Sequence, residues 1–382
     1  MSSQRPDEGS RVCSRILEAP RYLRTTTAAL SCALLLVPLI CARAAQALTF
    51  NFTPVSGTSQ QAINGFNAAG NLWSSFLSDN VTININIGFS ALGSGVLAQA
   101  GSTTQGFSYS DVRAALSRDA SSSLDAIAVS NLQGGNALQF LTNNTAGDVV
   151  LDNDGSGNNV VLDINTANAK ALGLIAANNS GRDATIEFST SFTYDFDRSD
   201  GITGGTFDFV GLAAHEIGHA LGFVSGVDEV DFFSGPKTGP RGAMDLNGFR
   251  VFNTLDLFRY SSASTNPASA GFGLQDLTQG TESYFSVDKG VTAGAAFSTG
   301  PFDGDGSQAS HWKDNQGLGI MDPTAAPGEL LLITGNDLGA FDAIGWNLTS
   351  VEVPEPSALH LIGGALFMLG GVRVFRRRKR AG

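Results

Sequence analysis

The sequence predicts an α+β fold for residues 48–350, with a mixed sheet, a helix that carries the functional residues and an irregular C-terminal part. Two patterns lead to this prediction. Apolar and polar side chains alternate over 81–89 and 184–194, which is the period of a half-buried strand. Over 60–77 and 208–221 the apolar side chains recur at helical spacing instead. Strand and helix patterns that follow each other in this way are typical of one α+β domain.

The first half begins with a strand at 48–54 and a helix over 60–77 whose apolar side chains share one face. The alternating strand 81–89 comes next. Residues 90–160 are rich in Gly, Ser and Asn, so we expect mostly long loops there, with one helix at 109–116. The apolar face of the first helix consists of Ile63, Phe66, Ala69, Leu72, Trp73 and Phe76.

The second half begins with the strand pattern at 184–194. The helix over 208–221 should end at Gly222, because glycine tolerates the backbone conformation that closes a helix. Near the end of the domain, Thr334 followed three residues later by Asp337 predicts the capping box of a last helix.

The charge of the chain is distributed unevenly. The formal net charge is −12, yet 12 of the 23 Lys and Arg lie before residue 48 or after residue 372. Residues 48–350 keep 11 basic and 30 acidic residues, a net charge of −19. An acidic body of this kind repels phosphate backbones, so nucleic acid is excluded as a partner.

The N-terminal 47 residues predict a signal peptide. A basic leader precedes an apolar run at 28–40, and the Ala-Gln-Ala ending suits cleavage after Ala47. The alternative is an N-terminal membrane anchor. All three cysteines precede residue 48, so the exported body would form no disulfide and has no cysteine to block a metal.

The C-terminal segment 353–382 predicts a second address. Pro354-Glu355-Pro356 precedes an apolar span at 358–372 and a basic cluster at 373–380. These three features in order resemble the PEP-CTERM sorting signal of Gram-negative bacteria. The resemblance implies transient contact with the inner membrane, processing by an exosortase-type system, and delivery to the cell surface or extracellular matrix. The alternative is a permanent single-span anchor.

A metal-binding pattern stands on the predicted helix 208–221. In His215-Glu216-Ile217-Gly218-His219 the two imidazoles are four residues apart, so they project from one face within reach of one ion. Glu216 can lie beside that ion and accept a proton from its water. The alternative interpretation is two core histidines and a surface glutamate.

Zinc needs a third protein ligand and an open position for water. His311 is the one other histidine between the two terminal signals. Asp228, Glu229 and Asp231 compete with it because they follow the helix closely. Imidazole is the commoner ligand, so we favour His311.

The run from His215 to Gly222 resembles the metzincin pattern His-Glu-x-x-His-x-x-Gly. Most metzincins have their third histidine three residues later, where this chain has Ser225. Residues 310–323 resemble instead the distant histidine and Met-turn of the leishmanolysin-like branch, which implies His311 as ligand and Met321 as the apolar floor beneath the metal. Most of 48–350 also resembles secreted metalloproteases that bear PEP-CTERM tails.

The resemblance implies a metzincin-like catalytic domain over 48–350, with an N-terminal lobe at about 48–222 and a C-terminal lobe at about 223–350. The expected activity is a secreted zinc endopeptidase that acts on protein or peptide substrates, with Glu216 as general base. Tyr260 and Tyr284 are candidates for stabilising the oxyanion by residue type alone. The alternative function is a surface or matrix-binding protein with a structural zinc or calcium site and no hydrolysis.

Acidic loops raise the question of calcium. Asp152, Asp154, Ser156 and Asp163 have the oxygen spacing of a calcium loop, with Gly155 and Gly157 between them. Solvated turns rich in Asp and Gly explain the pattern equally well. Two further clusters pose the same question, namely Asp303, Asp305, Ser307 and Asp314, and Asp195, Asp197 and Asp200.

Overall fold

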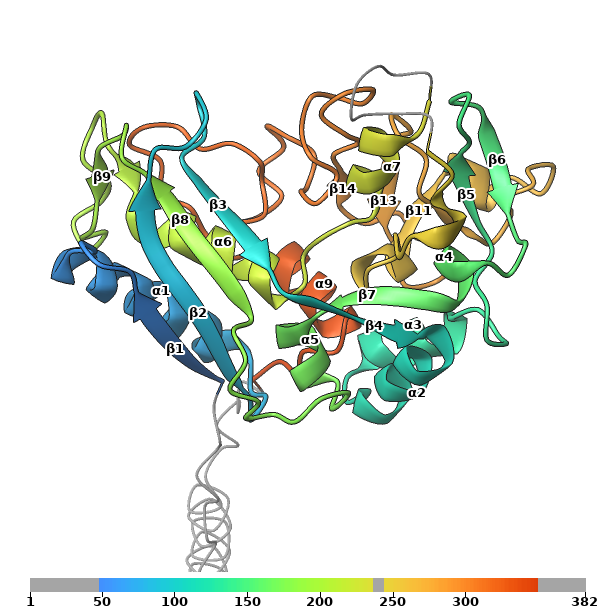
Figure 1. Ribbon diagram of the computed structural model, residues 1–382, viewed down its shortest axis with the longest axis horizontal. Helices are drawn as coiled ribbons and strands as arrows, with labels where there is room; N and C mark the ends of the chain where they lie inside the picture. The colour runs from blue at the N-terminus through green and yellow to red at the C-terminus, as the bar shows by residue number, and fades with distance from the viewer. Residues whose placement is uncertain (1–47, 236–243, 350–382) are drawn as a thin grey trace, which may run out of the picture. The chain divides into compact units, whose positions relative to one another are not determined.

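A four-stranded mixed sheet forms one side of the computed structural model, which describes residues 48–235 and 244–349 (Figure 1). The strand order is β1-β2-β8-β3, in which β1, β2 and β8 are parallel and the edge strand β3 is antiparallel to β8. The sheet and its helices make the fold α+β, as predicted. The strands are β1 (Thr49–Pro54), β2 (Thr82–Ser90), β8 (Ala184–Ser189) and β3 (Ala98–Ser102).

Two helices, α1 (Gln60–Phe76) and α6 (Phe209–Leu221), lie behind this sheet and pack against each other (Figure 1). Phe209, the first residue of α6, lies between the two layers, with its ring 4.3 Å from that of Phe188 in β8 and 5.2 Å from that of Phe66 in α1. Burial of large aromatic side chains dominates the energetics of such a core. The sheet therefore fixes where α6 begins.

The ends of α6 agree with the sequence prediction. At its N-terminus the Asp208 side chain accepts a hydrogen bond from the Gly211 backbone N–H at 2.9 Å, which satisfies one of the unpaired donors of the first turn. At its C-terminus Gly222 has φ 121°, a conformation that favours glycine. The helix therefore presents a defined length of 13 residues.

The expectation of long loops at 90–160 was wrong in most of its length. The structure has strands and helices there, and the one predicted helix extends to Asp119. The strands are only four or five residues long, and β3 and β4 consist largely of small or polar residues, so they lack the extended alternation that identifies a strand. The elements beyond β3 are β4 (Thr104–Ser108), α2 (Tyr109–Asp119), α3 (Ser123–Asn131), β5 (Phe140–Asn143), β6 (Val149–Asp152) and α4 (Gly157–Val160).

The strand predicted at 184–194 is also shorter than expected. β8 ends at Ser189, and the chain turns before β9 (Tyr194–Asp195), which pairs in parallel with β10 (Phe207–Asp208). The Tyr194 hydroxyl donates towards the carbonyls of Leu97 and Ser189, at 2.8 and 2.9 Å. Tyr194 therefore folds back on β8 rather than continuing it.

One of the smaller sheets crosses the predicted division at residue 222. β5 and β6 form one sheet with β12 (Gln275–Asp276), while β4 pairs with β7 (Val161–Asn165). The two lobes are therefore interleaved, and the described residues belong to one compact unit. The remaining elements are α5 (Thr166–Ala171), α7 (Val227–Phe233), the 3-10 helices η1 (Leu246–Gly248) and η2 (Leu255–Phe258), β11 (Arg259–Ser261), α8 (Ser262–Thr265), β13 (Ser283–Phe285) and β14 (Ala296–Phe297).

The last helix, α9 (Gly335–Ala343), has the predicted capping box. The Asp337 side chain accepts a hydrogen bond from the Thr334 backbone N–H, and the Thr334 side chain accepts one from the Asn336 backbone N–H. Between β14 and α9 the chain has no helix or named strand, which matches the expected irregular C-terminal part.

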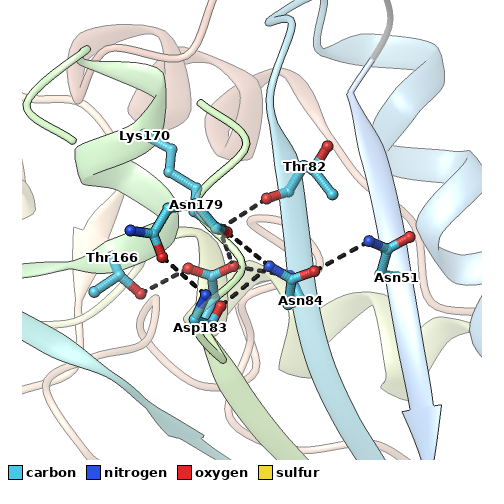
Figure 2. Close-up of polar contacts among 8 residues, drawn as sticks. Asn51, Thr82, Asn84, Thr166, Lys170, Asn179 and Asp183 are labelled. Carbon is cyan, nitrogen blue, oxygen red and sulfur yellow. Dashed lines mark hydrogen bonds and ion pairs between the residues drawn. The ribbon is translucent and has the colours of Figure 1, made fainter. Parts of the chain in front are cut away.

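A buried ion pair joins the sheet to α5 (Figure 2). Lys170 lies 2.5 Å from Asp183, and both side chains are almost fully buried. The Lys170 ammonium also donates to the Thr82 carbonyl at 2.8 Å, and Asp183 accepts from the Asn84 backbone N–H at 2.8 Å and the Thr166 hydroxyl at 2.7 Å. These bonds fix α5 against β2 and the start of β8.

The signal peptide at 1–47 and the sorting segment at 353–382 lie outside the described residues. Within 48–235 and 244–349, none of the helices combines the length and the apolar composition needed to cross a membrane.

Candidate metal centre

Two imidazoles lie one helical turn apart on α6. His215 and His219 have their Nε2 atoms 3.1 Å apart. Glu216 stands between them in the sequence of the helix. The i, i+4 spacing alone produces this pair.

The third imidazole comes from a distant part of the chain. His311 Nε2 lies 3.0 Å from His219 Nε2 and 3.3 Å from His215 Nε2. In 48–235 and 244–349, these three side chains make the one group of three or more His, Cys, Asp or Glu residues whose ligand atoms converge within 4.8 Å. The group could hold a metal ion.

The other nitrogen of each ring is occupied by a backbone carbonyl. His215 Nδ1 lies 2.7 Å from the Ile320 oxygen, His219 Nδ1 lies 2.8 Å from the Phe223 oxygen, and His311 Nδ1 lies 3.2 Å from the Gln308 oxygen. A carbonyl only accepts, so each Nδ1 carries the proton and each neutral ring is left with a lone pair on Nε2. Histidines that bind metals are oriented by outer partners in this way.

Burial keeps the three imidazoles neutral. It lowers the pKa of His215, and together with the neighbouring imidazoles it lowers the pKa of His219 to about 3 and that of His311 well below its ordinary value. Three lone pairs that face one another at 3.0–3.3 Å cannot hydrogen-bond to each other and repel. A cation at their centre removes that repulsion.

The spacing fits a small tetrahedral ion. Two nitrogens, each about 2.0–2.1 Å from such an ion, are about 3.3–3.4 Å apart. The observed separations are 3.0–3.3 Å. Imidazole ligands suit zinc and other transition metals, whereas calcium and magnesium prefer oxygen. Three protein ligands would leave a fourth position for water.

Glu216 is the carboxylate nearest to this group along the helix. It is buried, and burial raises its pKa to about 8. Among the described residues, none donates a hydrogen bond to its carboxylate. An unpaired buried carboxyl beside a metal site can exchange a proton with a water there, and a nearby dication would lower its pKa again.

Met321 packs against α6 at Gly218. A methyl group placed on Gly218 would clash with the Met321 sulfur, so the sulfur lies directly against the helix at Gly218. The backbone of this turn is tied to the third histidine, because the Trp312 N–H donates to the Met321 carbonyl at 2.9 Å. Sequence reasoning placed Met321 here through the resemblance alone.

Asp337 organises the same turn. Its buried carboxylate accepts from Trp312 Nε1 and the Ile320 N–H, both at 2.9 Å, and from the Met321 N–H at 3.3 Å. Ile320 in turn supplies the carbonyl that orients His215. The sequence identified Asp337 as a capping residue, and its second role has no local sequence signal.

The carboxylates that competed with His311 lie elsewhere. Asp228 accepts from the Ala309 and Ser310 backbone N–H groups, at 2.7 and 3.2 Å. Asp231 accepts from the N–H groups of Phe302 and Asp303, both at 2.8 Å. Glu229, on the same helix α7, is exposed. Neither aspartate joins the histidine group, and Ser225 donates to Asp256 at 2.6 Å.

The two tyrosines considered for the oxyanion make contacts within the C-terminal part. The Tyr260 hydroxyl accepts from Gln275 Nε2 at 2.9 Å, and the Tyr284 hydroxyl donates to the Gly290 carbonyl at 2.8 Å. Neither hydroxyl is bonded to a histidine of the group. The structure therefore adds no support for either tyrosine in this role.

The acidic loops do not gather their oxygens into a group. Asp152 accepts from Asn158 and Asn159, both at 2.9 Å, while Asp154 accepts from the Ser156 N–H and from Asn247. Asp163 lies apart on β7. The other clusters also bond to the protein itself: Asp195 and Asp197 cap turns, Asp305 pairs with Lys313, and Asp314 accepts from Thr324. These contacts favour structured turns over calcium loops.

No family profile, no curated protein and no solved structure matches this chain. The function therefore has to be inferred from the site itself.

Proposed function

We propose that this protein is a zinc-dependent endopeptidase, with His215, His219 and His311 as zinc ligands and Glu216 as general base. The observation that carries the proposal is the convergence of three neutral imidazoles whose Nδ1 atoms are all engaged by carbonyls. It is supported by the buried, unpaired Glu216 next to them. A structural zinc site has no need of an adjacent base, which argues against a binding protein with a merely structural metal.

Each residue of the site has its own role in the proposed reaction. The three imidazoles would hold the ion and would leave a fourth position for water. Bound zinc would supply Lewis-acid chemistry, polarising the scissile carbonyl and making a water more acidic. The Glu216 carboxylate accepts the proton of that water and passes it to the leaving amine. Ile320, Phe223 and Gln308 keep the rings in the ligating tautomer through their carbonyls.

The setting of this activity belongs to the same proposal. We propose a metzincin-like domain that is exported by the signal at 1–47 and sorted by the segment at 353–382 through an exosortase-type system. The protein would act at the cell surface or in the extracellular matrix of a Gram-negative bacterium. Its substrates would be proteins or peptides, and other envelope proteins with the same sorting tail are one class to test.

The decisive experiment compares wild type with Glu216→Gln. Both proteins should bind one zinc, since the ligands are unchanged, whereas hydrolysis of an unfolded protein substrate should fall by about 10²–10⁴-fold in the variant. Wild-type activity should also disappear with a chelator and return with zinc. The control is Glu282→Gln, which changes an exposed glutamate and should leave activity intact. Full activity in Glu216→Gln would refute the assignment.

A further inference from the structure

The segment that carries His311 has little regular structure to hold it. It follows β14 and contains neither a helix nor a named strand up to Met321. Its position near α6 nevertheless has to be accurate, because ligand atoms must lie within a few tenths of an ångström of their ideal distance from a metal. The segment is held instead by hydrogen bonds from other parts of the chain.

Two carboxylates on one face of α7 supply many of these bonds. Asp228 accepts from the Ala309 and Ser310 N–H groups, and its second oxygen also accepts from the Ser310 hydroxyl at 2.5 Å. Asp231, one helical turn later, accepts from the Phe302 and Asp303 N–H groups at 2.8 Å. Both oxygens of each carboxylate are occupied by donors of the segment 302–310.

These bonds surround His311 directly. The Ser310 hydroxyl also accepts from the Ser225 N–H at 2.9 Å, so the residue before His311 is tied to the chain that leaves α6. The carbonyl of Gln308, which orients the His311 ring, lies in the same fixed stretch. On the other side Arg259 donates to the Ala309 carbonyl at 3.3 Å and to the Ser298 carbonyl at 2.7 Å.

We propose that Asp228 and Asp231 form a carboxylate clamp that presents His311 to the metal. They act as positioning residues, and neither is a ligand. Gly300 makes the close approach possible, because a side chain there would meet the Asp231 carboxyl carbon at 2.7 Å. The clamp rests on the metal-binding part of the proposed function, and it gives α7 a role that the compact form of the motif does not require.

The test is the zinc affinity of Asp228→Asn in the full chain, measured by competition with a chelating dye. In the variant, an amide NH2 group replaces one of the two carboxylate oxygens. This group is a donor, so it cannot bond to the N–H donor that it faces. We expect zinc to bind about 10- to 100-fold more weakly, as is common when an outer partner of a metal ligand is lost. Ser310→Ala, a milder change, should weaken zinc binding less and serves if Asp228→Asn does not fold.

The matched control is Asp276→Asn. Asp276 is buried in the same part of the chain and also accepts three hydrogen bonds, from the Thr278 backbone N–H and from the hydroxyls of Thr278 and Ser261. Its loss should lower the free energy of unfolding but leave zinc affinity within twofold of wild type. Wild-type zinc affinity in Asp228→Asn, or an equal loss in Asp276→Asn, would overturn the clamp.

A spectrum separates a positioning residue from a ligand. At saturating cobalt(II), Asp228→Asn should show the wild-type visible spectrum, because the same three imidazoles bind the metal. A changed spectrum would make Asp228 a ligand and overturn the proposal. If wild type binds zinc and the affinities behave as expected but no peptide is cleaved, the proposed function fails while the clamp stands. A wild-type chain that binds neither metal would refute both.

Discussion

His215 and His219 stand on a helix that is closed at both ends by neighbouring residues, whereas His311 stands in a segment held by side chains from elsewhere in the chain. We call α6 with its sheet the helix side of the site, and the segment 299–321 the loop side. On the helix side the ligand spacing follows from 3.6 residues per turn. On the loop side it follows from carboxylates that accept hydrogen bonds from backbone N–H groups, chiefly those of Asp228, Asp231 and Asp337.

The difference shows what each kind of support can do. A helix sets two ligands at once but cannot reach around the ion to a third direction. A segment that forms neither a helix nor a strand can pass across the helix, provided that its backbone N–H groups find acceptors elsewhere in the chain. Each of these aspartates accepts hydrogen bonds from at least two backbone N–H groups. A few side chains therefore take the place of the hydrogen bonds that a neighbouring strand would provide.

The largest effect should come from removing one ligand on each side. His219→Ala and His311→Ala should each weaken zinc binding more than the loss of an outer partner, which costs about 10- to 100-fold. Each variant keeps only two of the three imidazole ligands. Zinc content after gel filtration and affinity by dye competition measure this. Gln316→Ala, an exposed change on the loop side, is the control.

This pair of variants tests whether the two sides contribute alike. Retention of one tightly bound zinc in His311→Ala, with loss in His219→Ala, would mean that the helix side binds the metal without the loop side. The third ligand would then have to be sought among other residues.

The same contrast explains what could be predicted from the sequence. α1, β2, α6 and the capping box of α9 were predictable because their signals lie within a few residues of each other. β3 was missed because its residues, from Ala98 to Ser102, are small or polar, and it is a strand only through its pairing with β8.

On the loop side, the sequence could not predict which backbone N–H groups a carboxylate would accept from. Asp228 and Ala309 are 81 residues apart, and every residue except proline has a backbone N–H that could be the partner. His311 itself was predictable because histidine is rare in this chain, with four in 382 residues. Its supports were not, because aspartate is common.

A smaller effect should appear where the two sides meet, at Gly218 and Met321. Alanine ordinarily stabilises a helix by about 1 kcal/mol relative to glycine. At Gly218 the new methyl group would clash with the Met321 sulfur, so we expect Gly218→Ala to lower the free energy of unfolding by about 1–3 kcal/mol. Urea unfolding measures this change.

Gly339 in α9 provides the matched control for that substitution. A methyl group there would have Leu124 as its nearest neighbour at 3.8 Å, an ordinary contact, so Gly339→Ala should keep or raise stability. If both alanine variants are equally stable, Met321 does not press on the helix and the two sides are less tightly joined than their contacts indicate.

The smallest effect concerns a second meeting point of early and late chain segments, around Asp119 at the end of α2. Asn347, after α9, donates to Asp119 at 3.2 Å and to Asp79 at 3.3 Å. Burial and the neighbouring Asp79 raise the pKa of Asp119 to about 7. The folded protein therefore holds this proton more tightly than the unfolded chain, and the resulting stabilisation is lost as pH rises towards 7 and above.

Replacing Asp119 by Asn should remove this pH dependence, because the amide resembles the protonated acid at every pH. We expect Asp119→Asn to match wild type near pH 4 and to exceed its free energy of unfolding at pH 8 by less than about 1 kcal/mol, since solvent screens part of the repulsion. Urea unfolding at pH 4, 6 and 8 measures the slope. Asp148→Asn, at an exposed position, should keep the wild-type slope. If Asp119→Asn is instead less stable than wild type at pH 8, the hydrogen bond from Asn347 to the charged Asp119 carboxylate outweighs the repulsion between the Asp119 and Asp79 carboxylates. The negative charge of Asp119 would then stabilise this junction.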